Sequence, residues 1–255
     1  MRTFLKELKY RNPLLYRFGW FNLLISILCI FLILADTAQV AGINRWIKPA
    51  KFYLSVGIVV WTLGWILYHL QSKATIRICS WLIIVTLFFE NAIILYQASR
   101  MKMSHFNNET AFDGLLFSLM GLLIFLFTCT VIYITVLFFR QKTVIHYSYC
   151  WGIRMGLVLF IFFSAEGGIM ISLLSHTVHG KDGGPGLPFL NWSTRAGDLR
   201  IAHFMGIHAL QLIPLAGYYI FKTKKQVLLF SLTYFLAALA LMLLALLGMP
   251  LIPVR

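Results

Sequence analysis

The sequence contains little charge: Asp, Glu, Lys and Arg make up only 12% of its 255 residues, and only eight residues are acidic. Soluble domains carry about a quarter charged residues, so the composition excludes an ordinary soluble fold. The four cysteines form no CxxC pair, and we therefore expect neither a disulfide nor a cysteine-based metal site. The last apolar run, 226–249, contains no lysine, which argues against a retinal protein with a Schiff base in its last helix.

Long apolar runs dominate the chain instead. Hydrophobic residues make up 60% of it, and the mean hydropathy is +0.83. A helix needs about 20 apolar residues to cross a bilayer, and this length predicts seven spans, at 19–40, 52–71, 77–99, 112–139, 148–177, 199–221 and 226–249. The predicted fold is an all-α, polytopic membrane bundle of seven transmembrane helices.

The basic residues predict the orientation of these spans. The formal charge is +14, but Lys and Arg lie in short segments between the apolar runs. That position favours topology signals and contact with anionic membrane lipid, and we expect no nucleic acid as a partner. With the N-terminus inside, 13 of the 22 basic residues are cytoplasmic. Residues 1–18 are predicted to form an interfacial amphipathic segment, and residues 19–255 a single transmembrane helical domain.

Two parts of the chain share one order of polar residues. In each, a glutamate is followed by a Ser-His pair, an aspartate and a Met-Gly pair: Glu90, Ser104-His105, Asp113 and Met120, then Glu166, Ser175-His176, Asp198 and Met205. This order predicts a parallel duplication of a two-helix hairpin. The two aspartates are expected to be helix N-caps.

Glu90 and Glu166 are the first candidates for function. An ionisable side chain inside a span costs on the order of a few kcal/mol unless it faces the bundle interior and has a partner. Both helices run outward in the predicted topology, so both carboxyls lie toward the outer leaflet. We expect them to carry a proton, to act as a catalytic base or to bind a metal; a structural carboxyl is the alternative.

Histidines and further polar residues gather at the same depth. The candidate metal ligands are His105, His176, His203 and His208. The last two lie about 140° apart on a helix, so they do not form the i, i+4 pair of a zinc motif. The candidate substrate-binding residues are Gln97, Arg100, Arg200 and Gln211. Because all these groups concentrate in the outer half, we predict one polar site that opens to the outer side.

The segments SHFN and GPGLPFLNWSTRAGDLRIAHF carry a family resemblance. In them the chain resembles a family of bacterial multi-spanning inner-membrane proteins of unassigned activity, over the third to sixth spans. The resemblance implies a multi-pass protein of the bacterial inner (cytoplasmic) membrane, and it implies no activity.

Three functions remain open. The first, which the sequence favours, is a protein that binds Zn, non-haem Fe or one haem through these imidazoles and glutamates, for redox or hydrolytic chemistry on a small molecule or a lipid. No short ligand motif supports it. The second is a proton- or ion-coupled transporter that uses Glu90 and Glu166; the scarcity of polar residues in the inner half and the lack of an obvious broken helix count against it. The third is a sensor or lipid-binding module in which Arg100 and Arg200 hold an anionic head group. The sequence does not specify the oligomeric state.

Overall fold

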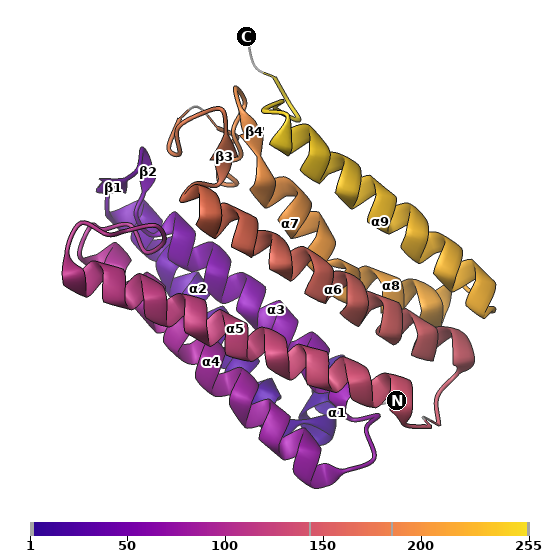
Figure 1. Ribbon diagram of the computed structural model, residues 1–255. Coiled ribbons are helices and arrows are strands. Elements are labelled where there is room, and N and C mark those ends of the chain that lie inside the picture. The colour runs from indigo at the N-terminus through magenta and orange to yellow at the C-terminus, as the bar shows by residue number, and fades with distance from the viewer. Residues whose placement is uncertain (1–2, 143, 185, 254–255) are drawn as a thin grey trace. The chain divides into compact units, whose positions relative to one another are not determined.

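The computed structural model describes residues 3–142, 144–184 and 186–253. In these ranges the protein is helical, with two short strand pairs in its loops. The chain forms two compact units, Met1–Ile134 and Thr135–Arg255, which are the N-terminal unit and the C-terminal unit below. Helix α5 (Ala111–Arg140) runs from the first unit into the second (Figure 1).

The N-terminal unit contains α1 (Phe4–Arg11), α2 (Pro13–Ala35), the antiparallel pair β1 (Gln39–Val40) and β2 (Ile43–Asn44), α3 (Ile47–Leu67), α4 (Lys73–Ser99) and most of α5. Helices α2 and α3 pack closely because their contact contains glycine. A Cβ on Gly19 would lie 1.9 Å from Nε1 of Trp61, and small residues allow spanning helices to approach in this way.

The first spanning helix begins earlier and ends earlier than the predicted range 19–40. Asn12 caps α2 by accepting a hydrogen bond from a backbone N–H of its first turn, and Pro13 suits the first helical position because its missing N–H would have no partner there. The helix ends at Ala35. Asp36 therefore lies outside the span, where its carboxylate accepts a hydrogen bond from the guanidinium of Arg45 at 2.6 Å.

The C-terminal unit contains the end of α5, α6 (Tyr147–Leu173), the antiparallel pair β3 (Thr177–Val178) and β4 (Gly197–Asp198), α7 (Leu199–Ile207), α8 (Ala209–Tyr219) and α9 (Lys224–Leu246). We call residues 175–184 and 186–198, which include β3 and β4, the cap. Part of the core of this unit lies where α6, α8 and α9 meet, around the buried side chains of Leu159, Ile213 and Val227.

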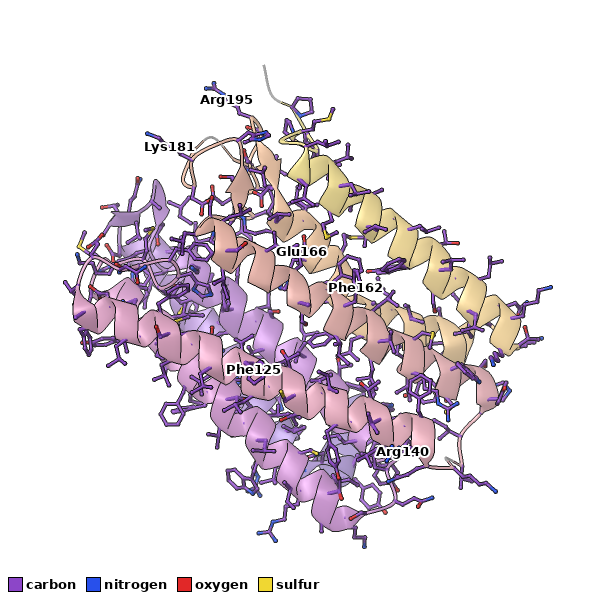
Figure 2. All side chains as sticks on the ribbon, in the orientation of Figure 1. Phe125, Arg140, Phe162, Glu166, Lys181 and Arg195 are labelled. Carbon is purple, nitrogen blue, oxygen red and sulfur yellow. The ribbon has the colours of Figure 1, made fainter. Side chains whose placement is uncertain are left out.

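Seven helices of the described chain, counting α7 with α8, are long and apolar enough to cross a membrane. The predicted all-α fold with seven spans is confirmed to this extent. Large apolar side chains such as Phe125 and Phe162 point outward from these helices (Figure 2). A surface of this kind suits lipid and is far more apolar than a soluble protein presents to water. The fold is that of an integral membrane protein.

The sixth span is interrupted, which the sequence pattern had not indicated. Helices α7 and α8 are separated at His208. The N–H groups of Gln211 and Leu212 both bond to the carbonyl of His208, so the hydrogen-bond ladder changes register there. Pro214 follows inside α8 and has no N–H to continue that ladder. The break places an ionisable side chain at an irregular point inside a span.

Candidate functional site

Glu90 lies inside the N-terminal unit on the buried face of α4. Its side chain is 3% exposed. Ile94 and Gln97, at helical spacing from it, are buried on the same helix, while Phe88 and Phe89 are exposed. One carboxyl oxygen of Glu90, Oε2, has no hydrogen-bond partner among the described residues.

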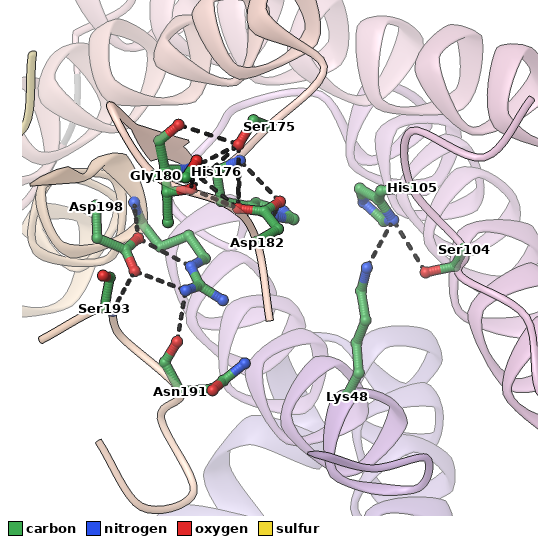
Figure 3. Close-up of polar contacts among 12 residues, drawn as sticks. Lys48, Ser104, His105, Ser175, His176, Gly180, Asp182, Asn191, Ser193 and Asp198 are labelled. Atoms are coloured by element: carbon green, nitrogen blue, oxygen red, sulfur yellow. Dashed lines mark hydrogen bonds and ion pairs between the residues drawn. The ribbon is translucent and has the colours of Figure 1, made fainter. Parts of the chain in front are cut away.

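The side chains of His105 and Lys48 form a chain of contacts that ends at Glu90. Nε2 of His105, in the loop between α4 and α5, lies 4.0 Å from Oε1 of Glu90. Nδ1 of the same ring lies 3.2 Å from Nζ of Lys48 and 3.1 Å from Oγ of Ser104 (Figure 3). Because a lysine ammonium only donates, Nδ1 accepts, and the neutral ring carries its proton on Nε2, which faces the glutamate. We call Lys48, His105 and Glu90 the relay.

Gln97 and Arg100 hold Asp113 of α5. Nε2 of Gln97 and Nη1 of Arg100 each donate to Oδ1 of Asp113 at 2.9 Å. The hydroxyl of Thr110 donates to the other carboxylate oxygen at 2.7 Å and accepts from the backbone N–H of Asp113. The prediction that Asp113 is an N-cap was wrong, because α5 begins at Ala111 and Asp113 lies inside its first turn. The cluster ties the end of α4 to the start of α5.

Further buried polar side chains lie on α4, beside Glu90 and in the first turns, where the sequence had suggested few of them. Nδ2 of Asn91 donates to Oδ1 of Asn22 on α2 at 2.9 Å, and Oδ1 of Asn91 has no partner among the described residues. Nearer the start of α4, Nδ2 of Asn12 donates to Oγ of Ser80 at 2.8 Å. All four side chains belong to residues at most 3% exposed. We call them the polar column; Asn22 and Asn91, single asparagines inside apolar runs, were its signal in the sequence.

Glu166 lies in α6 of the C-terminal unit (Figure 2). The residue is 3% exposed, and neither of its carboxyl oxygens has a hydrogen-bond partner within the described residues. Burial of an ionisable group without a hydrogen-bonded partner is costly in a membrane protein, and such residues mark proton or ion pathways.

His203 contacts α6 through a close approach of two helices. Its Nδ1 donates to the carbonyl of Phe163 at 2.8 Å, which leaves Nε2 of the neutral ring as an acceptor. Gly206, on the same face of α7, makes this contact possible: a Cβ there would lie 1.9 Å from Cγ of Phe163. Glu166 lies one helical turn beyond Phe163 on α6.

His208 stands at the break between α7 and α8. Its ring centroid lies 4.2 Å from that of Phe204, and its Nδ1 is buried without a partner among the described atoms. Gln211, predicted to share its face, bonds through its backbone N–H to the carbonyl of His208.

His176 belongs to the cap and binds Asp182 there (Figure 3). Nδ1 of His176 lies 2.7 Å from Oδ2 of Asp182, and the same carboxylate accepts from the backbone N–H groups of His176 and Thr177 and from the hydroxyl of Ser175. Burial acts to raise the pKa of Asp182, but the hydrogen bonds and the charge of His176 outweigh it and hold this pKa well below its usual range. No pattern in the sequence indicated this partner.

Arg200 is held by its neighbours in the cap. Its guanidinium donates to both carboxylate oxygens of Asp198, at 2.9 and 2.6 Å, and to the carbonyl of Asn191 at 2.5 Å (Figure 3). Asp198 also accepts from the backbone N–H of Arg200 as the N-cap of α7, so this predicted cap is confirmed.

The four predicted metal ligands have separate neighbours: His105 lies beside Lys48, His176 binds Asp182, His203 binds the carbonyl of Phe163, and His208 makes an edge contact with Phe204. Over residues 3–142, 144–184 and 186–253, no group of three or more His, Cys, Asp and Glu side chains could hold a metal ion. Metal binding therefore stays a prediction from the sequence.

Fold and site together define an integral membrane protein with one buried glutamate in a spanning helix of each unit. No protein-family model, curated protein or solved structure matches the chain. The function is therefore inferred from the residues themselves, and the resemblance noted from the sequence stays an expectation.

Proposed function

We propose that the protein is a proton-coupled transporter in which Glu90 and Glu166 carry the proton. One observation carries this proposal: Glu90 is buried in a spanning helix, faces the ring of His105 at 4.0 Å and keeps its other oxygen without a hydrogen-bond partner among the described residues. A carboxyl in such a place is far cheaper to bury with a proton than as an ion. The affinity of Glu90 for a proton therefore changes when its surroundings change.

The relay supplies a proton path to Glu90. Nε2 of His105 gives its proton to Oε1 of Glu90, while Nδ1 takes one from the ammonium of Lys48, so the ring stays neutral and Lys48 is left as an amine that regains a proton from solution. Transfer requires the 4.0 Å between Nε2 and Oε1 to shorten to about 3 Å.

Two further features support transport. The polar column supplies further buried polar side chains on α4, at Asn91 beside Glu90 and at Ser80 ten residues before it. The break at His208, close in sequence to His203, supplies the interrupted helix that is typical of transporter binding sites. Both features answer the objections that the sequence alone raises against this function.

The proposal includes a topology and a location. We infer a cytoplasmic N-terminus from the distribution of the 22 basic residues. In that orientation Lys48 and His105 face the outer side and the polar column leads inward. One buried glutamate in each unit supports, but does not require, the parallel duplication of a hairpin. A bacterial inner membrane is the location that the sequence resemblance implies.

The test is proton flux into vesicles that contain the purified full chain. A potassium diffusion potential drives protons inward, and a trapped pH dye reports their entry. We expect Glu90→Gln to reduce entry to the rate of protein-free vesicles and Glu166→Gln to slow it. Glu109→Gln is the matched control, because Glu109 is an exposed glutamate that pairs with Lys102.

If proton flux is strictly coupled to an unidentified substrate, the vesicles will show no flux without that substrate. A second measurement therefore tests Glu90 without relying on flux. Infrared difference spectra between high and low pH should contain a buried carboxyl signal that Glu90→Gln removes and Glu109→Gln keeps. The proposal fails if the wild type shows neither flux nor this signal, or if Glu90→Gln changes neither.

A further inference from the structure

One end of the C-terminal unit carries positive charge with no acid to balance it. This basic end, where α5 and α8 finish and α6 and α9 begin (Figure 1), holds Arg140, Lys142, Arg154, Lys222, Lys224 and Lys225. The three acids of the unit lie elsewhere. Asp182 and Asp198 belong to the cap, and Glu166 is about 18 Å from Arg154 along the axis of α6.

Two of these cations share one aromatic ring. Nζ of Lys224 lies 3.9 Å from the ring centroid of Trp151, and the guanidinium carbon of Arg154 lies 5.0 Å from it. Nε of Arg154 also donates to the carbonyl of Phe138 at 2.9 Å, which fixes the guanidinium in place. Both cations thus lie against the ring of Trp151, and an anion beside either of them would offset part of this positive charge.

A shallow, open groove begins at this point on the surface of α9. Its lining consists of Lys224 and Lys225 at the helix start and Leu228, Leu229 and Leu232 further along. These positions follow one face of the helix. Leu229 and Leu232 are 63% and 53% exposed. The groove therefore has cations at one end and an exposed apolar wall along the rest.

The start of α9 strengthens the attraction for an anion. Thr223 and Gln226 form a capping box that fixes the first turn. The N–H groups at the first positions of a helix have no acceptor inside it, and the positive end of the helix dipole lies there. The lysine ammonium groups and this dipole end act on the same side of the groove.

We infer that this groove binds one anionic glycerophospholipid of the surrounding bilayer, with its phosphate at Lys224 and Lys225 and an acyl chain along Leu228, Leu229 and Leu232. A free phosphate would use the lysines and leave the apolar wall empty. A zwitterionic lipid would cover the wall and bring no net charge to the cations. An anionic lipid matches both parts. The inference is independent of the proton path and is unaffected if that function is wrong.

Native mass spectrometry of the full chain in detergent tests the site. The probes are dioleoylphosphatidylglycerol and dioleoylphosphatidylcholine, which share their acyl chains and differ in net charge. We expect one phosphatidylglycerol to bind in preference to phosphatidylcholine. Lys224→Gln with Lys225→Gln should weaken this binding by roughly 25-fold, about fivefold for each cation removed. The capping box is intact in this variant, because Thr223 and Gln226 remain.

Lys181→Gln with Arg195→Gln is the matched control, because both residues are exposed cations at the cap of the same unit (Figure 2). It should bind the lipid like the wild type. If the double lysine variant does not fold, Lys225→Gln alone replaces it, with a fivefold loss expected. Equal binding of the two lipids, an equal loss in the control, or displacement of the lipid by excess inorganic phosphate would each overturn the inference.

Discussion

Nζ of Lys48 lies 3.2 Å from Nδ1 of His105, so a cation at the start of α3 fixes the tautomer of a ring in the loop between α4 and α5. The ring N–H then faces Glu90. Lys48 and His105 are separated in the sequence by the α3–α4 hairpin. Together they determine which proton donor faces the buried Glu90.

His105→Gln should slow proton entry into vesicles by on the order of a hundredfold, because an amide can accept from Lys48 but cannot pass a proton from one end to the other. Lys48→Arg should also slow the flux, since a guanidinium keeps a hydrogen-bond donor in place but does not give up its proton. Ser104→Ala, which removes the other contact of Nδ1, serves as the control. Flux in His105→Gln within twofold of the wild type would contradict the relay.

Gly206→Ala should destabilise the C-terminal unit by about 1–3 kcal/mol, the usual cost of an extra methyl group in a packed core. The new Cβ would meet Phe163 at 1.9 Å, and the two helices must separate to admit it. Gly121→Ala in α5 is the control, because a Cβ there meets no other atom within 4 Å. Thermal unfolding in detergent followed by circular dichroism measures both; equal midpoints for the two variants would count against the close contact.

Acid should destabilise the N-terminal unit through His69. Burial, and then the charge of Arg11, lower the pKa of His69 to about 4; Arg11 donates to its Nε2 at 3.3 Å. Between pH 6.5 and about 4 the unfolded chain binds a proton at this ring that the folded protein does not, so stability falls as the pH drops through this window, by about 3 kcal/mol at most.

His69→Gln should flatten this pH dependence, which is measured as the unfolding midpoint at a series of pH values. His179→Gln, at an exposed histidine, should leave it as steep as in the wild type. An equal slope in His69→Gln and the wild type would show that the ring is not the group responsible.

Asp182→Asn should loosen the cap. The carboxylate accepts backbone hydrogen bonds from His176 and Thr177, and its low pKa means that it supplies this stabilisation at every pH above the ordinary aspartate range and loses it only in strong acid. Amide hydrogen exchange at these two residues should accelerate by roughly tenfold to a hundredfold. Lys181→Gln, at the neighbouring exposed residue, should leave exchange unchanged; the same rate in both variants would be evidence against the cap contact.

Much of the fold followed from the sequence, because bilayer thickness sets the length of apolar run that a span requires. The seven spans are recognised on this ground alone, and their ends differ where local capping decides, as at Asn12 and Pro13. The break at His208 was not predicted, since a single proline in an apolar run gives a weak signal and the register change depends on packing against α6.

The sequence by itself determined that the protein is an integral membrane protein with seven spans and that Glu90 and Glu166 need an explanation, because hydropathy and the cost of buried charge are properties of single residues and short windows. Only the tertiary structure decided which groups meet them. It brought Lys48 and His105 to Glu90, gave His176 to Asp182, and left Glu166 without a hydrogen-bond partner in the described chain. Lys48, His105 and Glu90 belong to two helices and a loop, and spacing along the chain does not encode the packing that brings them together.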